Sequence, residues 1–165
     1  MKVGIQMLAV MFIAALAFSA CSDDDDKGRM TVPENISQAL KEKYAAATHI
    51  EWKQKGAYYV ADCRMDGREM DVWFNVQAEW QLTETDILWT GLPGTVQTAF
   101  NSSEYASWER EDIDLLESPL QPLQYVIEVE KGKIEYQLFY SEEGNLMQTR
   151  DVTGKDDTHW PVTNE

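Results

Sequence analysis

Residues 58–74 read YYVADCRMDGREMDVWF, which is two alternating runs joined by the dipeptide Asp66-Gly67. Asp-Gly favours a two-residue hairpin turn because both central positions need a positive φ angle, and the flanking side chains alternate with the period of β-strands. One face of the predicted hairpin is apolar and carries Tyr59, Ala61, Cys63, Met65, Met70, Val72 and Phe74. This stretch therefore predicts the centre of an antiparallel sheet that packs one face into a core.

A helix is predicted upstream of this hairpin, and one further strand downstream. Thr31 and Glu34 have the spacing of a capping box, with Pro33 between them in the first turn. Apolar residues follow at helical spacing, at Ile36, Leu40 and Tyr44. We expect the helix to end near residues 44–47 and the next strand to cover residues 79–85.

The same order then begins again in the second half of the chain. Leu92-Pro93 follows Val32-Pro33 by 60 residues, and residues 138–140 (LFY) correspond to residues 72–74 (VWF) at an offset of 66. The loop at residues 118–123 has room for the extra residues. We therefore predict an α+β fold of two tandem repeats, each a helix followed by an antiparallel β-meander. Repeat 1 spans residues 31–90, repeat 2 spans residues 91–150, and residues 151–165 form a polar C-terminal tail.

Residues 1–20 have the composition of a bacterial lipoprotein signal peptide. Lys2 precedes an apolar stretch at residues 5–17, which is shorter than the roughly 20 residues that a transmembrane helix needs. Phe18-Ser19-Ala20-Cys21 resembles a lipobox, in which the cysteine is lipidated and becomes the mature N-terminus. An ordinary secretory signal with a chance cysteine is the alternative.

Residues 21–30 are predicted to be an acidic tether outside the fold. Asp23-Asp24-Asp25-Asp26 follows Ser22, and blocks of like charge stay solvated. The same run resembles the signal that exports some Gram-negative lipoproteins to the outer face of the outer membrane. We therefore expect a cell-envelope protein that is lipid-anchored to the outer membrane through Cys21 and exposed at the cell surface, with the periplasmic face as the alternative.

The formal net charge of −15 excludes two classes of partner. Nucleic acids and anionic membrane surfaces repel a strongly acidic chain, so membrane contact is expected through the lipid anchor alone. The two cysteines and two histidines are too few for a Cys-based zinc site or a His-rich metal centre. No cofactor or metal is therefore predicted, and Cys63 is expected to be a buried apolar residue.

Catalytic residues are not evident, and we predict that the chain is not an enzyme. His49 and His159 are expected to be exposed, His159 within the polar tail, and neither forms a recognisable nucleophile motif with Ser102 or Ser103. The carboxylates of residues 62–71 fit a solvated strand face in a chain with 29 acidic residues. A hydrolase that uses these carboxylates is the least favoured function class.

Aromatic, proline and turn positions across residues 31–150 resemble the PepSY-like, beta-lactamase-inhibitor-like family of secreted or lipid-anchored proteins. The positions that carry the resemblance are Val32-Pro33, Tyr44, Trp52, Tyr58-Tyr59-Val60, Asp66-Gly67, Val72-Trp73-Phe74, Trp80 and Leu92-Pro93. The chain departs from the family's acid-x-x-Gly turn at residues 75–78 (NVQA), and again at Ser141, which stands at the acidic position before Gly144. The resemblance implies a beta-lactamase-inhibitor-like fold, in which an open sheet face binds an enzyme, although a shared fold does not establish a shared function.

Trp73 and Phe139 occupy equivalent positions on the predicted sheet face away from the helices. Trp73 alternates with Asp71, Phe139 alternates with Glu135, and Tyr58 is close to them in register. A sheet with helices on one side leaves its other face free, and Trp and Tyr are enriched at interface hot spots. These five residues form the predicted binding face, and the alternative is cross-strand aromatic packing with a purely structural role.

The function predicted from these features is a lipid-anchored binding module of the cell envelope. It presents the open sheet face to a protein or peptide, for example as an inhibitor of an envelope hydrolase, and the acidic chain predicts a target with a basic face. The alternative is a lipoprotein that binds a carbohydrate or another small ligand, because exposed Trp beside acids also stacks on sugar rings. A protein partner requires about 800 Å² of exposed patch, whereas a sugar requires a cleft.

Overall fold

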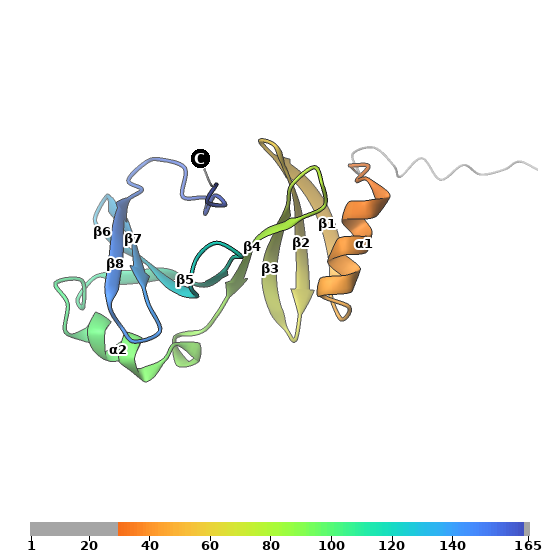
Figure 1. The fold of residues 1–165 in the computed structure, drawn as a ribbon. Coiled ribbons are helices and arrows are strands. Elements are labelled where there is room, and N and C mark those ends of the chain that lie inside the picture. The colour runs from red at the N-terminus through yellow and green to blue at the C-terminus, as the bar shows by residue number, and fades with distance from the viewer. Residues whose placement is uncertain (1–29, 164–165) are drawn as a thin grey trace, which may run out of the picture.

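The computed structural model describes residues 30–163, whose strands form a single eight-stranded antiparallel sheet (Figure 1). The strands follow one another across the sheet in sequence order, from β1 at one edge to β8 at the other. The predicted signal peptide (1–20), Cys21 and nearly all of the predicted tether lie outside the described residues.

Each half of the described chain places a helix before four strands, and the fold class is α+β. The first half consists of α1 (Glu34–Lys43), β1 (Thr48–Lys55), β2 (Tyr58–Met65), β3 (Arg68–Phe74) and β4 (Trp80–Asp86). The second half consists of the short 3₁₀ helix η1 (Trp89–Gly91), α2 (Gly94–Asn101), β5 (Glu109–Glu117), β6 (Gln124–Lys131), β7 (Ile134–Tyr140) and β8 (Leu146–Asp151). Residues 152–163 follow β8 without a helix or strand, and we define them as the C-terminal segment.

The start of α1 differs from the predicted capping box. Pro33 occupies the cap position with an extended backbone (ψ 139°), and no side chain caps the first N–H groups of the helix. Proline fixes φ but leaves ψ free, so Pro33 ends the incoming extended segment and Thr31 lies two residues outside the cap. The helix ends where expected, since the Tyr44 N–H donates to the Leu40 carbonyl oxygen at 2.8 Å.

Both helices pack on the same face of the sheet, and each has its own core. The core under α1 contains Ile36, Leu40, Ala61, Cys63, Met70, Val72 and Phe74. The core under α2 contains Ile87, Leu92, Val96, Phe100, Ile113, Tyr125, Ile127, Val129, Leu138 and Tyr140. Cys63 is fully buried, as predicted, and its burial raises the pKa of the thiol to about 11. Pairing of β4 with β5 joins the two halves into one sheet, which leaves the opposite face free of helices (Figure 1).

Equivalent turns in the two halves use different residues at the position with positive φ. Gly144 has a φ of 83° between β7 and β8, whereas Ala78 has a φ of 65° between β3 and β4. The Asn75 side-chain oxygen accepts hydrogen bonds from two backbone N–H groups, at 3.0 and 2.9 Å, which holds the turn around Ala78 in place. A Cβ on Gly144 would lie 2.6 Å from the Thr95 carbonyl oxygen of α2, so the second turn requires glycine.

We expect Gly144→Ala to lower the free energy of unfolding by about 2–4 kcal/mol. A left-handed conformation costs an L-residue about 1–2 kcal/mol, and the clash with α2 adds to this cost. Ala78→Gly is the matched control and should change the free energy of unfolding by less than about 1 kcal/mol. Urea denaturation followed by circular dichroism measures both variants, and equal losses would contradict close packing of the β7–β8 turn on α2.

Candidate functional site

The face of the sheet opposite the helices carries apolar side chains from both halves. We define the apolar strip as Val60, Trp73, Leu82, Leu116, Val126 and Phe139. Trp73 pairs in register with Val60 and with Leu82, and Val126 pairs with Phe139, so the strip runs from strand to strand across the sheet. Trp73 and Phe139 therefore lie on the face that the sequence alternation predicts.

The apolar strip is buried, which corrects the predicted exposure of its two aromatic residues. Trp73 is 0% exposed and Phe139 is 7% exposed. The C-terminal segment returns between the two halves of the sheet on this side (Figure 1). The ring of Trp160 lies 5.5 Å from that of Trp73, and the ring of His159 lies 5.7 Å from that of Phe139, both edge to face. The segment predicted to be a polar tail covers the strip because its aromatic residues find ring partners there.

Gln137 and Arg150 hold the C-terminal segment on the sheet, and we define this pair as the polar clamp. Gln137 is 2% exposed, and its amide nitrogen donates to the Asp157 carbonyl oxygen at 2.9 Å. Arg150 donates to the carbonyl oxygens of Asp157 and Thr158 and to the amide oxygen of Gln137. The backbone carbonyl groups of Asp157 and Thr158 lose contact with water where the segment lies on the sheet, and these hydrogen bonds satisfy them. The same bonds fix the position of the next residue, His159.

A row of carboxylates runs beside the apolar strip. We define the acidic belt as Asp62, Asp71, Glu84, Asp114 and Glu128. Four of these acids have a polar neighbour, namely Lys53 for Asp62 (2.6 Å), Lys55 for Asp71 (3.9 Å), His159 for Glu84 (3.0 Å) and Gln137 for Glu128 (3.0 Å). Burial, followed by the charge of Glu84, raises the pKa of Asp71. The belt is therefore a partly desolvated anionic surface that cations can stabilise.

Three of the four carboxylates that a hydrolase would use at residues 62–71, namely Asp62, Glu69 and Asp71, are paired with cations. Arg64 forms an ion pair with Glu69 in the same hairpin, and Lys53 of β1 pairs with Asp62 of β2. The four side chains of these two pairs are 43–57% exposed. This arrangement fits the solvated strand face that the composition predicts.

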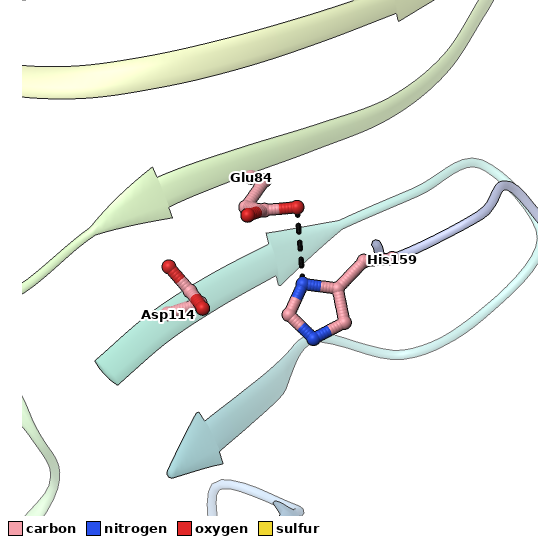
Figure 2. Close-up of side chains that lie close together, drawn as sticks. All are labelled: Glu84, Asp114 and His159. Atoms are coloured by element: carbon pink, nitrogen blue, oxygen red, sulfur yellow. Dashed lines mark ion pairs between the residues drawn. The ribbon is translucent and has the colours of Figure 1, made fainter. Parts of the chain in front are cut away.

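Three ionisable side chains from separate segments meet at the acidic belt (Figure 2). His159 Nδ1 lies 3.0 Å from Glu84 Oε2, but neither ring nitrogen has an aligned hydrogen-bond partner among the described residues. Asp114 is 5% exposed, and its Oδ1 has no hydrogen-bond partner there either. Burial, followed by the charges of Glu84 and Asp112, raises the pKa of the Asp114 carboxyl to about 9. Asp114 is the one member of the acidic belt that is buried.

The predicted exposure of the two histidines is right for one and wrong for the other. His49 is exposed in β1, as expected. His159 is 6% exposed, because the polar clamp draws its backbone onto the sheet and its ring packs on Phe139.

Exposed apolar side chains surround the outer surface of the C-terminal segment. Trp160 is 45%, Val162 46% and Leu120 44% exposed. Leu120, Val162 and Tyr58 line one depression, and Trp160 and Val162 line a neighbouring cleft of about 210 Å³ that reaches Phe139. We define Tyr58, Leu120, Trp160 and Val162 as the apolar rim.

Comparison with known proteins identifies the family. Residues 57–148 match the family described as "Putative beta-lactamase-inhibitor-like, PepSY-like". The crystal structure of a BLIP-like protein from Bacteroides fragilis is 46% identical to the chain, and the match covers 85% of this chain and 100% of that one, with a TM-score of 0.78. The chain belongs to this family. The PepSY-like protein thus has a BLIP-like fold, and its family is described by likeness to an inhibitor and not by a catalytic activity.

Other solved structures resemble the PepSY-like chain over most of its length. A DUF2874 family protein from Bacteroides ovatus is 37% identical, with a TM-score of 0.74 over 78% of this chain and 93% of that one. A protein from Bacteroides eggerthii, described as a "putative periplasmic" protein, is 30% identical, with a TM-score of 0.74 over 78% of this chain and 94% of that one. The comparison with curated proteins gives no match. None of the helices in residues 30–163 has the length and apolar character needed to cross a membrane.

In this PepSY-like protein, the five residues of the predicted binding face share the open side of the sheet without forming an exposed patch. Trp73 and Phe139 are buried, and Tyr58, Asp71 and Glu135 are half-buried. The C-terminal segment also binds the backbone of Glu135, whose carbonyl oxygen accepts a hydrogen bond from the Val152 N–H at 3.0 Å. The surface available to a partner is therefore the rim and the segment, and not the strip itself.

Sequence reasoning missed the residues of the C-terminal segment that complete this surface. The available signal was Trp160-Pro161-Val162, an apolar run within a mostly polar tail. Pro161 is buried, and Trp160 would lie 3.4 Å from a Cβ placed on Gly56 of the β1–β2 turn. A tryptophan next to other apolar residues in such a tail can dock on the body of the same chain, because an aromatic ring buries a large apolar area.

Proposed function

We propose that this PepSY-like protein is a protein-binding module of the cell envelope, anchored through a lipid on Cys21. Its binding surface lies on the open side of the sheet and consists of the C-terminal segment and the residues around it. Similarity to a BLIP-like protein supports a protein partner, and similarity to a protein described as "putative periplasmic" supports an envelope location. Inhibition of an envelope hydrolase is the form of this function that the family description favours.

The apolar rim is the observation that carries this proposal. Contiguous apolar side chains at the surface of a soluble domain mark interaction sites, and Trp and Tyr are frequent anchors in them. Three rim residues, Leu120, Trp160 and Val162, are 44–46% exposed. The acidic belt lies on the same side of the sheet, and the chain carries a net charge of −15, so a partner with a basic face would associate fastest.

A pull-down from cell-envelope extracts tests the proposal. The bait is the chain without residues 1–20, with Cys21→Ser to prevent lipidation. A Leu120→Glu, Val162→Glu double variant places charge on the apolar rim and leaves the buried apolar strip unchanged. We expect this variant to retain at least about tenfold less of any partner that the wild type captures. Met147→Glu is the matched control, because Met147 is 63% exposed on β8 and lies outside the rim.

The outcome that contradicts the proposal is equal retention of every captured protein by the wild type and the double variant. For a partner that the rim does retain, surface plasmon resonance at low and high salt measures the electrostatic contribution. The association rate should fall as salt rises, because exposed charges are screened beyond about 10 Å at 0.1 M ionic strength. A rate that does not depend on salt would remove the basic face from the proposal.

Carbohydrate binding is the second candidate, favoured by the position of Trp160 beside the cleft. A sugar ring stacked on Trp160 would fill a cleft of about 210 Å³. This volume is below the roughly 300–1,000 Å³ of typical ligand pockets, so we prefer a protein partner. A glycan array probed with the wild type and with Trp160→Ala separates the two candidates.

We also infer that the two halves are tandem copies of one unit, at residues 31–90 and 91–150. Two observations support this inference. Both halves place a helix before four strands, and Trp73 and Phe139 take equivalent places on the third strand of each half.

A further inference from the structure

Glu84, Asp114 and His159 converge on one point between β4, β5 and the C-terminal segment (Figure 2). One donor atom of each residue lies within 4.8 Å of the donor atoms of the other two. The closest pair is His159 Nδ1 and Glu84 Oε2, at 3.0 Å. Two carboxylates and one imidazole from three separate segments thus face one small volume.

Two of these side chains are buried, and each has a polar atom without a partner in residues 30–163. Asp114 is buried with Oδ1 unpartnered, and His159 is buried with Nε2 unpartnered, while its Nδ1 faces Glu84. Buried polar groups in native proteins are nearly always satisfied by protein, by water or by an ion. Buried carboxylate oxygens and imidazole nitrogens that lie this close together can bind a metal ion, because a cation accepts their lone pairs.

Neighbouring cations of the chain do not fill this role. Lys53 and Lys55 lie against Asp62 and Asp71, which are other members of the acidic belt. Arg150 is engaged with the backbone carbonyls of the C-terminal segment. The point between Glu84, Asp114 and His159 is therefore rich in donors and has no positive side chain assigned to it within the described residues.

We propose that Glu84, Asp114 and His159 bind one divalent transition-metal ion, for which Zn²⁺ is the best match. Zn²⁺ takes imidazole nitrogen and carboxylate oxygen at about 2.0–2.2 Å, usually in a tetrahedron, and three protein ligands leave one position for water. Tetrahedral donors at that distance lie about 3.4 Å apart. This separation is within the 4.8 Å that bounds the three donor atoms and close to the 3.0 Å between His159 Nδ1 and Glu84 Oε2. Ca²⁺ and Mg²⁺ prefer sites made of oxygen alone, which a histidine disfavours.

Binding at this site fastens the C-terminal segment over the apolar strip. His159 belongs to the segment, whereas Glu84 and Asp114 belong to the sheet. The polar clamp acts as a pair of positioning residues, because it fixes the carbonyl groups directly before His159. The ion therefore stabilises only the covered form of the sheet, and its binding energy adds to the stability of that form.

Isothermal titration calorimetry with Zn²⁺ tests the proposal on the metal-free chain without residues 1–20, carrying Cys21→Ser. We expect one saturable site in the wild type. Asp114→Asn keeps the shape of the side chain but removes its charge, and His159→Ala removes the imidazole. Each variant should weaken Zn²⁺ binding by at least about 100-fold, because loss of a residue that only supports a metal ligand already costs about 10–100-fold. His49→Ala is the matched control for loss of an imidazole. It should leave the affinity for Zn²⁺ unchanged, since His49 is exposed and is not one of the three proposed ligands.

Thermal unfolding separates loss of a ligand from loss of the fold. Excess Zn²⁺ should raise the Tm of the wild type and leave that of Asp114→Asn unchanged. Without metal, Asp114→Asn should have a Tm no lower than that of the wild type, because it replaces a buried acid whose Oδ1 has no hydrogen-bond partner in residues 30–163. Mg²⁺ at the same concentration should produce no shift.

Three results would overturn the proposal. The first is the absence of saturable Zn²⁺ binding to the wild type. The second is binding that both His159→Ala and Asp114→Asn retain. The third is binding that is lost in Asp112→Asn but kept in His159→Ala, which would move the ion to the exposed neighbours of Asp114, Asp86 and Asp112.

Discussion

Replacing Trp73 with alanine is expected to lower the free energy of unfolding by about 3–5 kcal/mol, the range for truncation of a buried aromatic residue. Trp73 has no exposed surface and heads the fully buried side chains of the described residues by volume. Its ring lies 5.9 Å from the ring of Tyr58 and 5.5 Å from that of Trp160. The variant therefore opens a cavity at the centre of the apolar strip, which urea denaturation followed by circular dichroism would detect.

Two further variants calibrate this loss. Trp73→Phe keeps most of the ring and removes an indole N–H without a hydrogen-bond partner in residues 30–163, so the expected loss is about 1–2 kcal/mol. Trp160→Ala makes the same truncation at a side chain that is 45% exposed, and should cost about 1 kcal/mol. Equal, small losses for Trp73→Ala and Trp160→Ala would show that Trp73 is not buried on the open side of the sheet.

Removal of residues 152–165 is expected to lower the free energy of unfolding by about 2–4 kcal/mol. The truncated chain loses the apolar contacts of the C-terminal segment and the hydrogen bonds of the polar clamp, worth about 1 kcal/mol each, while it regains the entropy of the segment. The apolar strip becomes exposed, so the truncated chain should also bind the dye ANS while it remains folded.

The matched control for this truncation removes residues 164–165 alone, which lie outside the described residues. It should leave both stability and dye binding unchanged. A chain ending at Asp151 that is as stable as the full chain and does not bind dye would contradict a structural role for the C-terminal segment.

The strands at the centre of each half could be predicted because their patterns are local. Asp66-Gly67 fixes the β2–β3 turn with positive φ at both residues, and alternation on either side assigns each side chain to a face. The α1 stripe of Ile36 and Leu40 is buried for the same reason, since helical spacing places both residues on one side. Local periodicity therefore identified the elements and the faces, including the face of Trp73.

Two strands could not be predicted because their patterns are weak. β5 reads EREDIDLLE, and its first four residues are charged and exposed, so alternation of apolar residues begins only at Ile113. β1 is an edge strand without a fully buried residue, and His49 adopts a φ of 53° where its register shifts. Edge position and charge remove the burial that gives a strand its periodic signal.

The covered state of the open face could not be predicted because it depends on contacts between distant residues. Gln137 and Arg150 come from β7 and β8, and each has an ordinary polar position in sequence. Only the folded sheet brings them together to bind the carbonyl oxygens before His159. The tail therefore looked solvated from its composition, while its structure is determined by long-range hydrogen bonds.

The most direct test of this account is a nuclear Overhauser measurement on the chain without residues 1–20, carrying Cys21→Ser. If the C-terminal segment covers the apolar strip, cross-peaks will connect the indole protons of Trp160 with those of Trp73, and the ring protons of His159 with those of Phe139. The ring centroids of these pairs are 5.5 and 5.7 Å apart, close enough for edge protons to be observed. Absence of both sets of cross-peaks, with random-coil shifts for residues 157–160, would contradict the account.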